Sequence, residues 1–169
     1  MFNKKVVLIT GGTGSFGQQC ARHLLNNYKP RKLIIFSRDE LKQYQMQKKF
    51  KENNLRFFIG DIRDKSRLTT ALREVDYVIH LAASPGVRNS LKLPIFYFNN
   101  NVNTFINIID LARLHKCRFL YASSSSVYNS EFNRFPLSER EKSLCPKSIY
   151  GLTKLNNEVI AKIYNDNKA

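Results

Sequence analysis

The chain has 169 residues, of which 43% are hydrophobic and 24% charged, and its formal net charge is +15. This composition is typical of one soluble globular domain, which buries roughly two-thirds of its unfolded surface. No apolar run approaches the ~20 residues of a membrane-spanning helix, so a membrane protein is excluded. The first residues lead directly into an apolar run, and we therefore expect no signal peptide and a cytoplasmic location.

The net charge of +15 has two interpretations. It either serves a polyanionic partner, such as nucleic acid or an anionic cofactor and substrate, or it reflects basic residues spread over a solvated surface. The basic residues are scattered and form no dense cluster, so we favour the second interpretation and expect no nucleic-acid partner. Three cysteines without metal-ligand spacing predict reduced thiols and no metal site: Cys20, Cys117 and Cys145.

Apolar runs typical of buried strands alternate with helical segments along the whole chain. This alternation predicts an α/β fold, a Rossmann-type doubly wound parallel sheet in a single domain over residues 1–169. Strands are expected at 6–9, 32–36, 55–60, 76–83 and 117–122, and helices at 18–27, 40–52, 65–73, 94–114 and 149–165.

A glycine-rich turn joins the first strand to the first helix. Gly11 allows the sharp turn, Gly14 lets a pyrophosphate approach the backbone, and Gly17 lets the helix pack closely on the strand. The free N–H groups at the helix start would face the phosphates. The turn therefore predicts dinucleotide binding by Gly11, Thr13, Gly14, Ser15, Phe16 and Gly17.

The residues after the second and third strands bear on the choice of cofactor. Ser37 and Arg38 supply a donor and a cation that suit the 2′-phosphate of NADP, whereas NAD enzymes place an acidic residue there. Asp39 stands one position later, where it could instead cap the following helix. Asp61 could accept from the adenine amino group or cap a helix. We predict NADP, with NAD as the alternative.

A tyrosine and a lysine lie one helical turn apart at the start of the last helix. A Lys154 ammonium beside Tyr150 would favour the phenolate that a general base at neutral pH requires. Three other pairs share this spacing and are interpreted as surface residues: Tyr28/Lys32, Tyr44/Lys48 and Tyr164/Lys168. Ser124 follows the fifth strand, so its hydroxyl could bond the same reacting oxygen as Tyr150.

With these motifs the chain resembles the extended short-chain dehydrogenase/reductase family, specifically its nucleotide-sugar epimerases and dehydratases. The segments 10–17, 36–43 and 57–65 resemble the inverting UDP-N-acetylglucosamine 4,6-dehydratases, which are NADP enzymes. Segments 86–88, 121–128 and 150–154 resemble UDP-glucuronate and UDP-glucose 4-epimerases.

The resemblance implies specific roles in transient oxidation of a UDP-sugar at C4. Ser124, Tyr150 and Lys154 would be catalytic, and Arg88, Ser124 and Ser125 would contact the substrate. Further cofactor contacts would come from Ile62, Leu81, Ala82, Ala83, Asn101, Tyr150 and Lys154.

Two departures from the family's pattern bear on the reaction. Ser125 and Ser126 stand where the dehydratases carry an Asp-Lys pair, and Asn129 replaces a usual glycine. Because dehydration needs an acid and a base that are not visible, the residues favour an epimerase. A 4,6-dehydratase and a non-catalytic dinucleotide-binding module are the alternatives.

Relatives of this kind continue with a C-terminal substrate domain. Without it, we expect residues 118–121 to form an exposed sheet edge and this chain alone to bind cofactor weakly, with little turnover. A homodimer through the long helix after Pro94 and the last helix is a further expectation.

Overall fold

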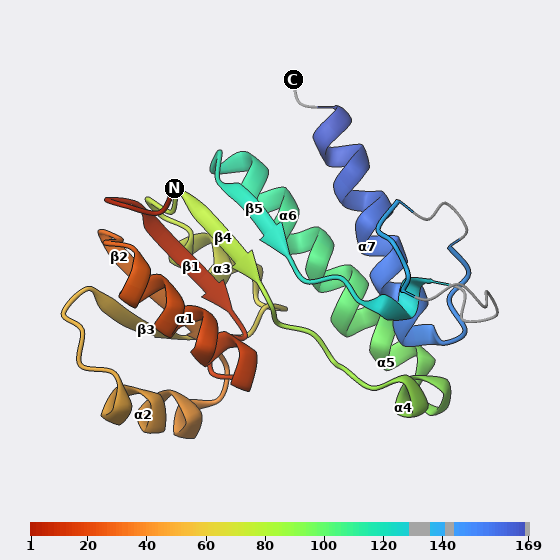
Figure 1. Cartoon of the computed structure of the whole chain (residues 1–169), viewed down its shortest axis with the longest axis horizontal. Helices are drawn as coiled ribbons and strands as arrows, with labels where there is room; N and C mark the ends of the chain where they lie inside the picture. The colour runs from red at the N-terminus through yellow and green to blue at the C-terminus, as the bar shows by residue number, and fades with distance from the viewer. Residues whose placement is uncertain (129–135, 141–143, 168–169) are drawn as a thin grey trace. The chain divides into compact units, whose positions relative to one another are not determined.

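The computed structural model describes residues 1–128, 136–140 and 144–167. Its chain forms two compact units, one of residues 1–82 and 107–122 and the other of residues 83–106 and 123–169 (Figure 1). The assignment of the whole chain to one domain stays a prediction. In the described part of the chain, no helix has the length and apolar character that crossing a membrane requires.

The first unit contains a five-stranded sheet whose paired strands all run parallel, in the order β3-β2-β1-β4-β5. This sheet confirms the predicted α/β doubly wound class. Its elements are β1 (Val6–Thr10), α1 (Ser15–Asn27), β2 (Lys32–Ser37), α2 (Glu40–Lys49), β3 (Leu55–Ile59), α3 (Lys65–Ala71), β4 (Tyr77–His80), the later part of α6 (Thr104–Leu114) and β5 (Arg118–Tyr121).

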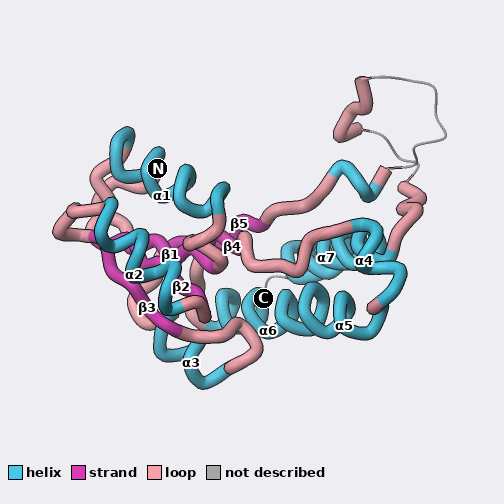
Figure 2. The backbone as a smooth tube through the Cα atoms, turned by 90° about the horizontal axis from the view of Figure 1, so that it is seen from below, coloured by secondary structure: helices cyan, strands magenta, loops and turns pink. Residues whose placement is uncertain are grey.

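The run of apolar residues in β1 is continuous because both faces of the strand are covered. Val6 and Leu8 pack into one core cluster with side chains of α3 and α6. Val7 and Ile9 pack into a second cluster with side chains of α1 and α2. All four residues are fully buried. Figure 2 accordingly shows α1 and α3 on opposite sides of the strands.

The second unit is built from helices. It comprises α4 (Val87–Lys92), α5 (Pro94–Phe98), the π-helical turn η1 (Asn99–Asn103), the start of α6, the 3₁₀ turn η2 (Ser125–Val127) and α7 (Ile149–Asp166). The single helix predicted from Pro94 to Leu114 is therefore interrupted at η1. Helix α4 was not predicted, because six residues carry too little periodicity to mark a helix.

Two aspartates cap helices of the first unit, and only one of them was expected. The Asp39 carboxylate accepts from the Lys42 N–H at 2.9 Å and caps α2, which is the alternative role that the sequence offered for this residue. Asp61 does not cap α3, because Asp64 does so by accepting from the Arg67 N–H at 3.0 Å. Asp61 instead accepts from the Arg63 N–H at 2.9 Å.

Replacing Gly17 with alanine should destabilise the chain. A Cβ at Gly17 would lie 2.6 Å from the Gly11 carbonyl oxygen and 2.6 Å from Gly12 Cα, so the backbone must move. We expect Gly17→Ala to lower the free energy of unfolding in urea by about 1–3 kcal/mol. Gly14→Ala is the matched control, because its Cβ would meet nothing nearer than 3.4 Å. Equal losses from the two variants would contradict this account.

Candidate functional site

The glycine turn of the first unit has the geometry that a pyrophosphate site requires. Gly11 has a φ of +66°, and its N–H donates to the Phe36 carbonyl at 3.0 Å. Helix α1 begins after exposed Gly14 without any side-chain cap. The N–H groups of its first turn, together with the positive end of the helix, are therefore open to an anion.

A pair of hydroxyl groups joins this turn to the end of β2. Thr13 Oγ1 and Ser37 Oγ lie 2.8 Å apart, and both side chains are buried. Ser37 Oγ also accepts from the Asp39 N–H at 3.3 Å. Whichever hydroxyl donates within the pair, the other keeps its own proton. The pair thus supports the turn and still offers one donor to a ligand.

Three charged side chains cluster after β2 and β3. Arg63 binds both carboxylate oxygens of Asp61, with Nε–Oδ1 at 3.0 Å and Nη2–Oδ2 at 2.7 Å. The Arg38 guanidinium is 3.6 Å from the same carboxylate, and its side chain is 69% exposed. The Arg63 hydrogen bond, opposed by partial burial, lowers the pKa of Asp61. Because Arg63 already forms two hydrogen bonds with the Asp61 carboxylate, the exposed Arg38 guanidinium can still bind another anion.

The other predicted cofactor residues of the first unit also follow the carboxyl ends of strands. The Leu81 and Ala82 N–H groups donate to the Thr10 carbonyl and hydroxyl at 3.1 and 3.3 Å, respectively. These bonds hold the exit of β4 beside the glycine turn. The turn residues Ser15 and Phe16 are exposed, and Ile62 is half-buried.

In the second unit, helix α7 carries the predicted catalytic pair at its start. Ser148 caps the helix by accepting from the Gly151 N–H at 3.0 Å. Tyr150 is half-buried, whereas Lys154 is only 6% exposed. Burial lowers the pKa of the Lys154 ammonium. The two residues share one helix face, as the spacing predicted.

The serine run packs against the same end of α7. Ser124 caps η2 by accepting from the Ser126 N–H at 3.2 Å. A Cβ at Gly151 would collide with the Ser126 carbonyl oxygen, so only glycine allows η2 to lie this close to Tyr150. The structure therefore brings the Ser124 segment to the Tyr150 turn.

The remaining predicted residues of this unit differ in exposure. Asn101 is 2% exposed, and its side chain bonds the Ser84 N–H at 2.7 Å and the Ser84 carbonyl at 3.1 Å. The asparagine expected to touch the cofactor thus has a structural role inside its own unit. Arg88 and Ser125 are exposed, Ala83 is half-buried, and Asn129 lies outside the described residues.

One of the tyrosines interpreted as surface residues, Tyr28, is half-buried. Tyr28 packs on the second core cluster, with its ring 5.3 Å from that of Phe2. Tyr44 is exposed and carries the Lys48 ammonium 4.3 Å from its ring centre, as a surface pair would. Lys168 lies outside the described residues. Spacing alone therefore did not separate half-buried from exposed tyrosines.

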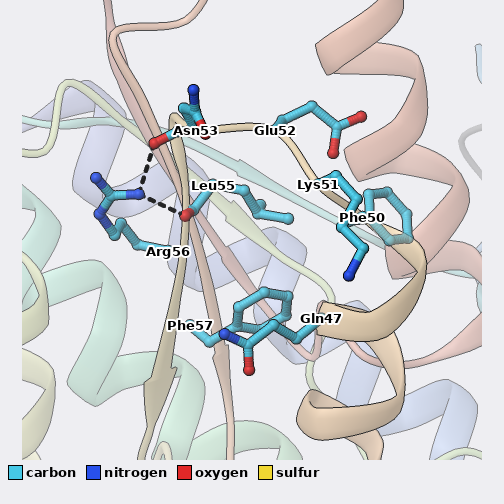
Figure 3. A pocket seen from close by; sticks show the side chains of 8 residues that line it. All are labelled: Gln47, Phe50, Lys51, Glu52, Asn53, Leu55, Arg56 and Phe57. Atoms are coloured by element: carbon cyan, nitrogen blue, oxygen red, sulfur yellow. Dashed lines mark hydrogen bonds between the residues drawn. The ribbon is translucent and has the colours of Figure 1, made fainter.

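A separate cavity of about 540 Å³ lies beside the start of β3. Arg56 on its wall turns back to the Asn53 and Leu55 carbonyls at 2.7 and 2.8 Å (Figure 3). The cavity lies where β3 begins, whereas the glycine turn lies where β1 ends. Because the strands are parallel, the cavity and the turn are at opposite ends of the strands. The cavity therefore does not belong to the dinucleotide site.

A parallel doubly wound sheet with this glycine turn, followed by a helix that starts Tyr-x-x-x-Lys, defines the short-chain dehydrogenase/reductase class. The profile of the family described as GDP-mannose 4,6 dehydratase matches residues 8–169. The chain therefore belongs to this family of nucleotide-sugar epimerases and dehydratases.

Named relatives include both kinds of enzyme. The inverting UDP-N-acetylglucosamine 4,6-dehydratase of Campylobacter jejuni is 42% identical over 158 residues, which are 94% of this chain and 43% of that protein. The UDP-glucose 4-epimerase of Rickettsia bellii is 34% identical over 142 residues, 82% of this chain and 42% of that protein. The likeness to the dehydratases thus extends beyond the first half of the chain.

Solved structures share the fold. The UDP-glucuronic acid 4-epimerase of Bacillus cereus, solved with UDP-glucuronic acid and NAD, is 29% identical with a TM-score of 0.82. The match covers 96% of this chain and 52% of that one. The chain thus spans about half the length of the proteins it matches.

Removing Arg63 should raise the pKa of Asp61. A carboxyl whose pKa is lowered in the folded state stabilises the fold above its unfolded pKa, and this contribution is lost as the pH falls through the folded pKa. In Arg63→Gln, carboxyl NMR titration should place the Asp61 midpoint higher than in the unmodified chain, and the stability that Asp61 loses on acidification should become smaller. Arg73→Gln, which removes an exposed arginine, is the control. An unchanged midpoint in Arg63→Gln would contradict the assignment.

Proposed function

We propose that this chain carries the dinucleotide-binding and catalytic residues of a nucleotide-sugar 4-epimerase that uses NADP and acts on a UDP-sugar. The observation that supports an epimerase most directly is the setting of Tyr150. It shares a helix face with buried Lys154 and packs beside the Ser124 segment, where Ser125 and Ser126 offer hydroxyls but no acid or base.

The residues then have distinct roles in transient oxidation at C4. Tyr150, as phenolate, takes the proton of the sugar 4-hydroxyl and later returns it. Ser124 donates a hydrogen bond to the oxygen on which charge develops. Lys154 favours the ionised form of Tyr150 and holds the cofactor ribose. A nicotinamide bound there would supply the hydride acceptor and donor for C4, so that epimerisation at C4 involves no net oxidation.

The glycine turn and the first turn of α1 would hold the pyrophosphate, and Arg38 would bind the 2′-phosphate of NADP. The exposed Arg38 guanidinium and the prior pairing of Asp61 with Arg63 support this choice. The Bacillus cereus structure holds NAD, which keeps NAD as the alternative.

Exposed apolar side chains in the second unit support self-association. Leu91, Leu93 and Ile95 of the α4–α5 region are more than half exposed, with Ile95 at 75%, as are Val159 and Ile163 of α7. Apolar surface of this extent on a soluble domain marks an interaction site. We propose a homodimer that uses the helices after Pro94 and α7.

A 4,6-dehydratase is the second candidate, favoured by the 42% identity to the inverting dehydratase. The two reactions differ in mass, because epimerisation conserves the mass of the sugar nucleotide and dehydration removes one water. We expect mass spectrometry and NMR of UDP-sugars incubated with stoichiometric amounts of the chain and NADP⁺ to show the 4-epimer at unchanged mass. Tyr150→Phe should abolish it. A product lighter by one water would replace the epimerase with the dehydratase, and cofactor binding without any product would favour a non-catalytic module.

Arg38 should set the cofactor preference. Loss of one charged hydrogen bond predicts that Arg38→Gln weakens NADP⁺ binding by about tenfold or more in calorimetric titration, with NAD⁺ binding unchanged. Lys48→Gln, an equal charge loss at the other end of α2, should change neither. An equal loss for both cofactors in Arg38→Gln would contradict the 2′-phosphate assignment.

A further inference from the structure

The backbone of Tyr150 is held at both its N–H and its carbonyl by side chains of the second unit. The N–H, which lies in the first turn of α7 and has no intrahelical acceptor, donates to Ser90 Oγ at 3.0 Å. The carbonyl accepts from Thr153 Oγ1 at 2.7 Å. Ser90 was not singled out in the sequence, and Thr153 appeared there only as a member of the 150–154 motif.

Ser90 is fully buried and has no freedom to serve another partner. Its hydroxyl donates to the Val87 carbonyl at 2.6 Å, so its proton is used and its oxygen is left to accept from Tyr150. The Ser90 N–H donates to the Gly86 carbonyl at 3.2 Å, within the first turn of α4. The Tyr150–Ser90 hydrogen bond thus joins the start of α7 to α4.

Thr153 is held in turn by the π-helical turn. Asn101 Nδ2 donates to Thr153 Oγ1 at 3.2 Å, and the same side chain bonds Ser84. The Asn101 carbonyl, in the same π-helical turn, accepts from Asn157 Nδ2 at 3.1 Å, so α7 meets η1 at two successive helical turns.

We propose that Ser90 is a positioning residue for Tyr150, with Thr153 fixing the other end of the same residue. The reaction for which Ser90 would position Tyr150 is the 4-epimerisation of the proposed function, on which this part of the inference rests. Helix α4 also carries Arg88, a predicted substrate residue, so the Ser90–Tyr150 bond links that helix to the Tyr150 backbone. The phenol oxygen of Tyr150 must be placed within hydrogen-bond reach of the sugar hydroxyl for proton transfer.

Amide hydrogen exchange of the ¹⁵N-labelled chain, followed by NMR, tests the contact directly. Loss of one buried hydrogen bond should speed exchange of the Tyr150 amide by about tenfold in Ser90→Ala. The Gly151 amide, capped by Ser148, should keep its rate and serves as an internal control. Asn89→Ala, an exposed position on the same helix, is the matched control and should change neither amide.

Further variants keep the test decisive. If Ser90→Ala does not fold, Ser90→Cys fills similar space with a weaker acceptor and should also speed Tyr150 exchange. Thr153→Val should loosen the same turn, and Thr153→Ser should restore it. A Tyr150 rate within about twofold of the unmodified chain in the Ser90 variant that folds would overturn the proposal.

The positioning role has its own readout. In Ser90→Ala, kcat for 4-epimer formation should fall by about tenfold while the dissociation constant of NADP⁺ stays unchanged. Faster Tyr150 exchange with an unchanged kcat would overturn the positioning role. An unmodified chain that forms no product counts against the proposed function, whereas the exchange comparison decides the Ser90 contact by itself.

Discussion

The close approach of α1 to the end of β1 is the constraint on which the first unit depends. Gly17 lies against the backbone of Gly11 and Gly12 with no room for a Cβ. This contact sets where the helix begins and hence where its unpaired N–H groups point. Gly11 also has no room for a side chain, because a Cβ added there would lie 2.8 Å from the Ala82 nitrogen. These two glycine contacts together position the first helix, the exit of β4 and the candidate anion site.

In the second unit, the main feature is the set of hydrogen bonds that holds Tyr150 at the start of α7. Helix termini leave N–H groups without partners, and here Ser148 and Ser90 accept from two successive ones. The π-helical turn contributes the Asn101 side chain and its carbonyl to the next two turns of α7. Buried polar contacts rigidify a site to the extent that their members are satisfied. The Ser90 and Thr153 hydroxyls each donate and accept a hydrogen bond, whereas Asn157 Oδ1 is a buried side-chain atom without a partner in the described residues. The helix that carries Tyr150 and Lys154 is therefore held by its neighbours as well as by its own hydrogen bonds.

The fold was predictable because its signals are local. The continuous apolar run of β1, the glycine turn and the alternation of strands and helices each follow from neighbouring residues, and the sheet confirms them. The π-helical turn and the short helix α4 were not predictable because five or six residues carry too little periodicity. The Ser90–Tyr150 bond was not predictable because its partners lie 60 residues apart. Asp61 pairs with Arg63, only two residues further along, rather than with a helix N–H, and the sequence pattern does not indicate which of these partners it takes. Tyr28 shows that residue spacing alone does not predict burial, because it is half-buried and its ring packs against Phe2.

Thermal unfolding of the unmodified chain with NADP⁺, with NAD⁺ or with neither tests the central claim that the glycine turn and Arg38 form an NADP site. A ligand that binds only the folded state stabilises it by about 2.7 kcal/mol at a hundredfold excess over its dissociation constant. The account predicts a higher Tm with NADP⁺ than with NAD⁺ at equal concentration. A clear unfolding transition that neither cofactor shifts would contradict it.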